Sequence, residues 1–183
     1  MSEDRDRTAL ALTGTARAAI AAALGVRTAP PPDSPLLDAR RGVFVTLTIG
    51  SRLRGCIGRV DASGTLRRLL PEMARAAAFE DPRFPPLSRE EYDRVGIEVS
   101  VLSPPERPGS PDDIVLGTHG VIVSAPGHRG LLLPQVATEW NWTREELLAN
   151  ACEKAGLAPD AWQKPATRIE TFTAEVYREA GRG

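Results

Sequence analysis

The residue types best suited to chemistry lie in one hexapeptide, Leu53-Arg54-Gly55-Cys56-Ile57-Gly58. Side chains alternate between the two faces of a strand. We therefore expect Leu53 and Ile57 to point into the core, and Arg54, Cys56 and Gly58 to share the other face. A nearby cation favours the thiolate over the thiol. Cys56 is thus a candidate nucleophile or redox thiol assisted by Arg54, or else a small packed residue, because free cysteines are commonly buried.

Arg54 has two interpretations of its own. Its planar guanidinium suits bidentate recognition of a carboxylate or phosphate on a small molecule. It could equally form an internal ion pair with an acid such as Glu98 or Asp81. In the first interpretation Gly55 and Gly58 leave the backbone open, and the three residues together bind substrate.

Two further residues could move protons. Glu98 is expected on the non-core face of a strand, where it is a candidate general base, a solvated carboxylate or the partner of an arginine. His119 could serve as the base of Cys56, since a thiol and an imidazole are the parts of an activated nucleophile. Nothing in the sequence places His119 beside Cys56, so it is the weaker candidate.

A stiff loop supplies Asp81 and Arg83. Three prolines within residues 82–86 fix the backbone there. A rigid loop can hold functional side chains, which makes Asp81 and Arg83 candidates for substrate binding. The same loop could be a connector in which Asp81 caps a turn. The second cysteine, Cys152, lies within a predicted helix without such a cation and is expected to be structural.

The composition is that of an ordinary folded protein, with 42% hydrophobic and 26% charged residues and a net charge of −1. Neither nucleic acid nor a membrane surface is expected as a partner, because there is no excess of basic charge. No apolar stretch approaches the roughly 18 to 20 residues that span a bilayer. The acidic N-terminus does not resemble a signal peptide, so we expect a cytoplasmic protein.

No metal or cofactor is expected on this chain. There is no C-x-x-C, no H-x-x-x-H and no clustered set of carboxylates. Two cysteines are too few for the three-cysteine cluster motif of a radical SAM enzyme. Glycine-rich loops of the Walker or dinucleotide type are also missing.

Local patterns predict the elements that must position these residues. Alternating apolar residues predict a hairpin over residues 42–60 and a strand over 95–101. Further strands are expected at residues 119–124, 130–133 and 168–176, and helices at 8–24, 65–79 (interrupted at Pro71) and 143–155. A capping-box pattern of Ser88 and Glu91 predicts one more short helix. A Pro-rich connector occupies residues 26–41, with its prolines between 30 and 35. Without strict strand–helix alternation, the pattern indicates an α+β fold with a largely antiparallel, sheet- or barrel-like core flanked by helices.

Several segments together resemble one family. The hexapeptide resembles the signature of the AMMECR family, whose prokaryotic members are called AmmeMemoRadiSam system protein A. Five supporting blocks follow in order: AAFEDPRFPPL at 77–87, IEVSVL at 97–102, GTHGV at 117–121, LLPQV at 132–136 and KAGL at 154–157. The resemblance covers about residues 10–178.

The resemblance implies a single AMMECR-type domain of two unequal subdomains, the larger built from both ends of the chain, with a possible small insertion at about 61–94. It also implies two partners, a Memo-like protein and a radical SAM enzyme, but no established reaction. We therefore expect an accessory or small-molecule-binding protein. The alternative is a cysteine-dependent enzyme in which Arg54 activates Cys56 toward a small anionic or amide substrate.

Overall fold

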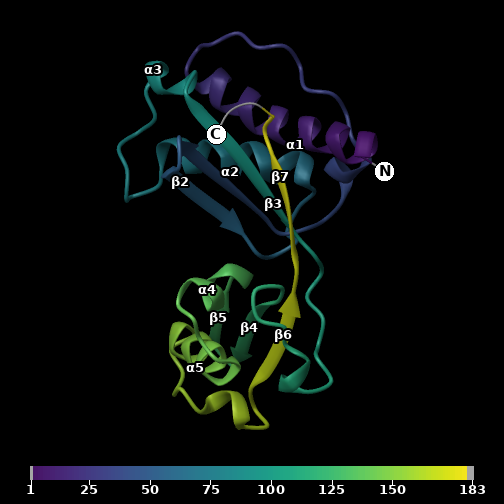
Figure 1. Ribbon diagram of the computed structural model, residues 1–183, viewed down its shortest axis with the longest axis vertical. Coiled ribbons are helices and arrows are strands. Elements are labelled where there is room, and N and C mark those ends of the chain that lie inside the picture. The colour runs from purple at the N-terminus through teal and green to yellow at the C-terminus, as the bar shows by residue number, and fades with distance from the viewer. Residues whose placement is uncertain (1, 181–183) are drawn as a thin grey trace. The chain divides into compact units, whose positions relative to one another are not determined.

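The computed structural model describes residues 2–180 and divides into two compact units (Figure 1). Unit 1 contains the chain up to Leu102 together with the segment from Glu175 onward, and unit 2 is Ser103–Ala174. Both ends of the chain thus belong to unit 1. The smaller unit is the segment after Leu102, whereas residues 61–94 form part of unit 1.

Unit 1 is built on a four-stranded sheet in the order β2-β1-β3-β7. Its strands are β1 (Val43–Ile49), β2 (Arg52–Arg59), β3 (Val95–Leu102) and β7 (Ala174–Arg178). The central strand β1 pairs antiparallel with β2 and with β3. Its alternation follows the sequence, because Val43, Val45 and Leu47 are fully buried while Phe44, Thr46 and Thr48 are half-buried. The sheet therefore has one core face and one open face.

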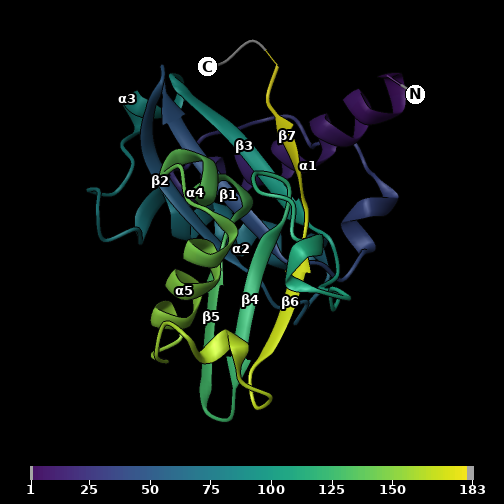
Figure 2. The same cartoon turned by 60° about the horizontal axis from the view of Figure 1, so that its bottom comes forward.

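Two helices cover the core face, α1 (Ser2–Ala23) and α2 (Leu66–Phe79). Figure 2 shows both behind the strands of this sheet. Helix α1 ends as predicted, with Gly25 in the left-handed region at φ 67 and Val26 N–H donating to Ala21 O at 2.8 Å. Helix α2 is continuous, so the predicted interruption at Pro71 is wrong. Leu70 before Pro71 and Met73 after it are both buried, and this packing holds the helix together.

The Pro-rich connector is anchored to α2. It contains a short 3-10 helix, η1 (Pro35–Asp38), which begins at Ser34. The guanidinium of Arg67 donates to Asp38 at 2.8 Å and to Asp33 at 3.0 Å. Both carboxylates lie on the connector, so one helical arginine fixes two points of it.

Unit 2 has a three-stranded antiparallel sheet in the order β5-β4-β6. Its elements are η2 (Pro111–Asp113), β4 (Gly120–Ala125), β5 (His128–Leu132), α4 (Pro134–Glu139), α5 (Arg144–Lys154), η3 (Ala161–Gln163) and β6 (Arg168–Phe172). Helix α5 begins with the predicted capping box of Thr143 and Glu146. Helix α4 was not predicted. Cys152 is fully buried in the core of this unit, as expected of a structural cysteine.

The strand predicted at residues 168–176 is two strands. β6 belongs to the sheet of unit 2 and β7 to that of unit 1, with Thr173 between them. Thr173 O accepts from Ser103 N–H at 2.9 Å, so the two chain segments that join the units are hydrogen-bonded to each other. The alternation of side chains along a strand indicates which face is buried, but it does not indicate which strand lies next to it. The change from the sheet of unit 2 to the sheet of unit 1 could therefore not be predicted from residues 168–176.

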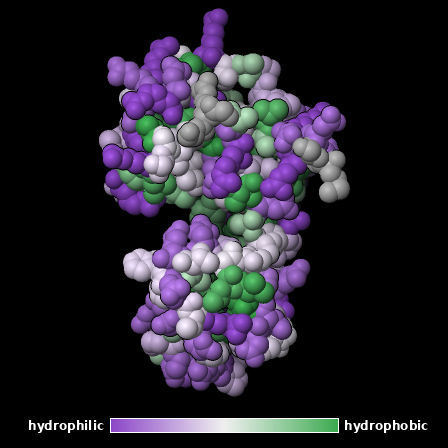
Figure 3. All heavy atoms as spheres, in the orientation of Figure 1, coloured by the Kyte–Doolittle hydropathy of each residue, from purple (hydrophilic) through white to green (hydrophobic). Residues whose placement is uncertain are grey.

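The α+β class with largely antiparallel sheets is therefore confirmed. The face drawn in Figure 3 is mostly polar, with smaller apolar areas on each unit. Among residues 2–180, no helix combines the length and the apolar character needed to cross a membrane.

Candidate functional site

A β-bulge at Arg54 sets the geometry of the hexapeptide. Leu47 lies opposite Gly55 and Thr48 opposite Leu53, so Arg54 has no counterpart in β1. The extra residue changes the alternation, and the expected faces are partly wrong. Leu53 is 42% exposed on the open face, whereas Arg54 is buried. Cys56 lies on the open face, as expected, beside Thr46.

The buried guanidinium of Arg54 belongs to an internal ion pair. It donates to both carboxylate oxygens of Glu91, at 2.8 and 2.9 Å, and to Pro85 O at 2.9 Å. These bonds from Arg54, with those from Ser88, lower the pKa of Glu91 to about 2. The acid is therefore neither Glu98 nor Asp81, and Arg54 is not the cation beside the thiol. Its Nη1 is buried and has no hydrogen-bond partner in the described residues.

The two glycines of the hexapeptide have packing roles. A Cβ atom at Gly55 would lie 2.1 Å from Ala77 O, so α2 can approach β2 only over a glycine. A Cβ at Gly58 would lie 2.3 Å from the Phe44 ring, which covers it on the open face. Close packing thus accounts for both residues, and their predicted contribution to substrate binding stays a prediction.

Cys56 is fixed by contacts on three sides. Its half-buried Sγ lies 3.3 Å from Thr46 Oγ1, the residue opposite it in β1. Its N–H donates to Asp81 Oδ2 at 2.9 Å, and its carbonyl accepts from Arg83 Nη2 at 3.2 Å. Because both backbone groups point away from β1, Thr46 and Cys56 form a non-hydrogen-bonded pair, in which side chains lie closest.

Asp81 and Arg83 act together at the free edge of β2. Asp81 is buried and accepts from the guanidinium of Arg83 at 2.7 and 2.9 Å. The bond from Arg83, together with the backbone N–H groups of Cys56 and Arg83, holds the pKa of Asp81 well below its usual range. The two side chains take the place of a neighbouring strand, and the half-exposed Arg83 is the cation that contacts Cys56.

Glu98 lies in the same row across the sheet. Thr46 is opposite Cys56 on one side and opposite Glu98 on the other. Glu98 Oε2 lies 2.8 Å from Arg178 Nε of β7 in an ion pair, which is the arginine partner expected above as one alternative for this residue. We call Cys56, Thr46, Glu98 and Arg178 the cross-strand row. Its members come from all four strands of unit 1, so the whole sheet positions them.

Sequence reasoning missed Thr46, Glu91 and Arg178. Thr46 had a usable signal, because it lies on the polar face of a predicted strand in the same hairpin as Cys56. Glu91 was recognised as a capping residue, and its second role as the partner of Arg54 depends on a long-range contact. Arg178 follows the predicted last strand, and nothing local connects it to Glu98.

His119 belongs to unit 2 and to a different environment. Its Nδ1 accepts from Val115 N–H at 3.1 Å, which fixes the ring against its own loop. This contact gives His119 a structural role, and a pairing with Cys56 stays a prediction.

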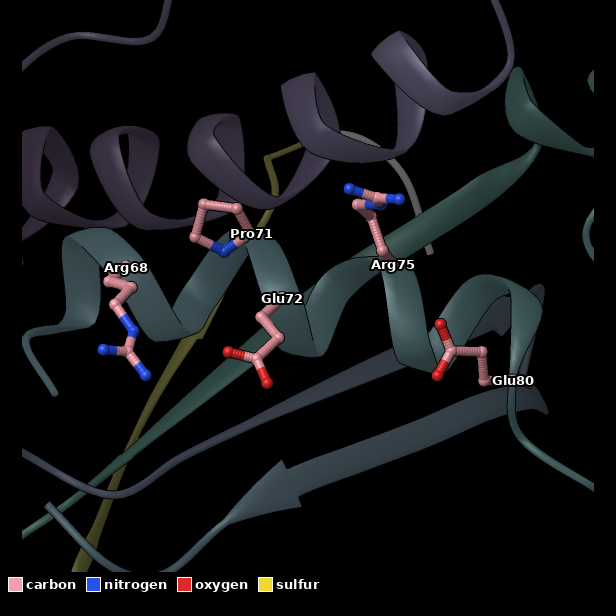
Figure 4. A pocket seen from close by; sticks show the side chains of 5 residues that line it. All are labelled: Arg68, Pro71, Glu72, Arg75 and Glu80. Atoms are coloured by element: carbon pink, nitrogen blue, oxygen red, sulfur yellow. The ribbon is translucent and has the colours of Figure 1, made fainter. Parts of the chain in front are cut away.

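Two other kinds of site were considered. Within residues 2–180, no three or more His, Cys, Asp or Glu residues are grouped so that they could hold a metal ion. A groove of about 480 Å³ along α2 is lined by five residues whose side chains are drawn in Figure 4: Arg68, Pro71, Glu72, Arg75 and Glu80. Charges of both signs alternate along it, as on a solvated helix face. Helix α2 packs on the face of the sheet opposite Cys56, so the groove is separate from the cross-strand row.

Comparisons with known proteins agree on one family. The AMMECR1 family model matches residues 13–177. A protein of Methanothermobacter thermautotrophicus is 50% identical over 158 residues, with 82% of each chain covered. Protein TK0174 of Thermococcus kodakarensis is 45% identical over 161 residues, covering 82% of this chain and 78% of that protein. The crystal structure of uncharacterized protein PH0010 from Pyrococcus horikoshii matches with a TM-score of 0.81 and 42% identity, covering 96% of this chain and 93% of the other.

Proposed function

From the premise that this chain belongs to the AMMECR1 family, we propose that it is a cytoplasmic small-molecule-binding accessory protein whose ligand lies on the open face of unit 1. The observation that carries the proposal is the cross-strand row. A thiol, a hydroxyl, a carboxylate and a guanidinium follow one another across four strands, on a face that α1 and α2 leave uncovered. Such a set offers donors and acceptors to a small amide or carboxylic acid.

Two features make this face suited to binding. The Cys56 peptide is held on its outer edge by Asp81 and Arg83, so the thiol has a fixed position before a ligand arrives. The guanidinium of Arg83 is 55% exposed, with its Nη1 outside the pair with Asp81. Arg83 therefore takes over the anion-binding role that we first assigned to Arg54.

The partners are proposed from the family resemblance, whose prokaryotic members are typically encoded beside a Memo-like protein and a radical SAM enzyme. Exposed Leu53, beside Cys56 on the open face, gives such a partner an apolar contact. In this proposal the protein presents a bound small molecule to one of the two enzymes.

The ligand is tested with a panel of small carboxylic acids and primary amides, by saturation-transfer NMR. Binding of a primary amide by the wild type is expected to weaken at least about tenfold in Glu98→Gln, because the amide N–H loses a charged hydrogen bond to the Glu98 carboxylate. Glu72→Gln, in the groove along α2, is the matched control and should bind as the wild type does. No binding by any member, or equal losses in both variants, contradicts the proposed site.

The partners are tested by calorimetry with a purified Memo-like protein and a purified radical SAM enzyme. Leu53→Asp is expected to abolish binding to one of them. Leu10→Asp, at an even more exposed leucine on α1, should leave it intact. Binding that is absent in the wild type, or insensitive to Leu53→Asp, argues against an accessory role through this face.

A second candidate function is thiol chemistry at Cys56, with Thr46 and not Arg54 as the contacting group. The 3.3 Å contact between Thr46 Oγ1 and Cys56 Sγ favours it, because it holds the half-buried thiol in one orientation. Any small molecule found by the panel can be followed for conversion. Turnover by the wild type that survives Cys56→Ser unchanged excludes this role while leaving the binding function in place.

A further inference from the structure

Unit 2 carries a solvent-exposed tryptophan that the proposed function does not use. Trp140 is 68% exposed, more than any other large apolar side chain in residues 2–180. Tryptophans are on average well buried in folded proteins, and exposed ones are enriched where partners bind. Val115, at 53%, is the other large apolar side chain exposed in this unit.

The indole of Trp140 is held in place. It stacks on Trp142, with ring centroids 6.2 Å apart and an interplanar angle of 21°. Trp142 in turn packs against the core of unit 2. A rigid aromatic surface loses little conformational entropy when a partner binds, which favours docking there.

The backbone around the two indoles is fixed as well. Helix α4 ends in a Schellman motif, in which Trp142 N–H donates to Ala137 O at 2.9 Å and Asn141 N–H to Thr138 O at 3.4 Å. Asn141 accordingly has a φ of 53. The capping box of α5 follows directly. Trp140 is thus exposed on a turn whose backbone is held in place by hydrogen bonds.

Val115 lies on a neighbouring loop that is joined to this turn. Arg144 donates to Ile114 O at 3.1 Å and to Asp112 at 3.2 Å. A Cβ at Gly117 would lie 2.9 Å from Thr138 Cγ2, so the backbone of this loop lies close to a side chain of α4. We call Val115, Trp140 and Trp142 the Trp140 platform.

The charges around the Trp140 platform indicate which kind of partner could bind there. Residues 112–119 and 138–146 contain five carboxylates against one guanidinium. Asp112 is paired with Arg144, while Asp113 and Glu146 cap backbone N–H groups. The side-chain carboxylates of Glu139 and Glu145 are exposed and have no hydrogen-bond or ion-pair partner within residues 2–180. This acidic setting repels nucleic acid and anionic membranes, and it attracts cations.

We propose that the Trp140 platform docks a basic segment of a partner protein, with an arginine or lysine side chain over the exposed face of Trp140. A cation over an indole is attracted by the negative face of the ring. Glu139 and Glu145 would supply carboxylates to the same cationic side chain or its neighbours. This site lies in unit 2 and is independent of the small-molecule site in unit 1.

The test uses a capped glycine-rich peptide with two arginines, and the same peptide with neutral citrulline in their place. The indole N–H resonances of ¹⁵N-labelled full-length protein report binding, with Trp162 as the internal reference. We expect Trp140 and Trp142 to shift saturably with the arginine peptide, about fivefold more tightly than with citrulline, and added salt to weaken binding.

Variants separate the contributions of charge and ring. Trp140→Ala should abolish the response. Glu139→Gln should weaken binding about threefold, while the exposed carboxylate change Glu153→Gln on α5 should leave it unchanged. Three results overturn the proposal: no shift of Trp140, equal affinity for the citrulline peptide, or a Trp140 resonance that changes on dilution of the protein alone. The last would mean that a second copy of the chain covers the platform.

Discussion

At the residue scale, Arg83 is the cation that contacts Cys56, and Arg54 belongs to a separate pair with Glu91. The two arginines therefore have different tasks. Arg54 is buried on β2, and its ion pair with Glu91 connects this strand to the helix α3 (Arg89–Tyr92). Loss of Arg54 removes that connection. Arg83 is half-exposed and holds the Cys56 peptide together with Asp81. Substitution of Arg54 should therefore lower the stability of the fold, whereas substitution of Arg83 should change the position of the Cys56 thiol.

Native-state alkylation should distinguish the two cysteines. Cys56 is half-buried on an open face, whereas Cys152 is fully buried and its pKa is raised by burial. Iodoacetamide at pH 8 is expected to modify Cys56 in the folded protein and Cys152 only after unfolding, because thiolate and access are both required. Peptide mass spectrometry measures the two rates. Equal rates would show that Cys56 is as inaccessible as the core cysteine.

The ion pair of Arg54 and Glu91 should make the free energy of unfolding depend on pH in the acidic range. The folded-state pKa of Glu91, about 2, lies below its ordinary value of 4.5, so the ionised form stabilises the fold. This contribution is complete above pH 4.5 and is lost as the pH falls toward 2. Glu91→Gln should lower the free energy of unfolding by about 3 kcal/mol at pH 7, since Arg54 remains buried without its partner.

Urea unfolding of the wild type and Glu91→Gln at several pH values measures this effect. The difference between the two proteins should shrink as the pH falls from 5 to 2, because Glu91 has a pKa of 4.5 in the unfolded chain and of about 2 in the folded protein. Ser88→Ala, which removes the cap of α3 but leaves both bonds between Arg54 and Glu91 in place, serves as the control. A difference that stays constant over this interval would mean that the ion pair does not stabilise the fold.

At the scale of elements, β2 is an edge strand that is protected without a neighbouring strand. The bulge at Arg54 interrupts the edge, and Asp81 with Arg83 occupies the backbone groups of Cys56. Both are recognised means of preventing edge-to-edge association. The stiff loop of residues 81–86 therefore has a structural reason to lie where it does, and it fixes the candidate site at the same time.

The contact between β2 and α2 should tolerate no side chain at Gly55. A Cβ there would lie 2.1 Å from a backbone oxygen of α2, which cannot move without the helix. Gly55→Ala should lower the free energy of unfolding by about 2 to 3 kcal/mol. Gly64→Ala, where the nearest atom lies 3.4 Å away, should change it by less than about 0.5 kcal/mol. Chemical denaturation measures both, and equal effects would contradict the close approach of strand and helix.

At the scale of the whole molecule, residues 2–180 form two hydrophobic cores, and the chain crosses between the two units twice. One core lies within unit 1 and the other within unit 2. The chain passes between the units only after Leu102 and before Glu175. Because the buried contacts are segregated in this way, each unit has a source of stability of its own.

A cavity in the core of unit 2 should therefore act mainly on that unit. Leu147 is fully buried on α5, and Leu147→Ala should cost about 2 to 5 kcal/mol of local stability. Hydrogen exchange read by mass spectrometry should show lost protection in β4, β5 and α5, with β1 and β3 unchanged. An equal loss in both sheets would mean that the chain unfolds as one cooperative unit.

The fold class, most of the helices and strands, and their caps could be predicted from local patterns in the sequence. Alternation in residues 43–49 and 95–102 and the capping boxes at Ser88 and Thr143 are local signals, because backbone geometry makes them depend on near neighbours. The hexapeptide also identified the family and pointed to Cys56. These conclusions hold wherever the segments lie in space.

The tertiary structure alone decided which side chains meet. The bulge at Arg54, the clamp of Asp81 and Arg83 on Cys56 and the row from Cys56 to Arg178 join residues far apart in sequence. The same holds for the split of the last predicted strand between two sheets. The register of a strand and the choice of its neighbour depend on how whole sheets pack against helices. This packing involves residues far apart in the sequence, so it produces no periodic pattern within a single segment.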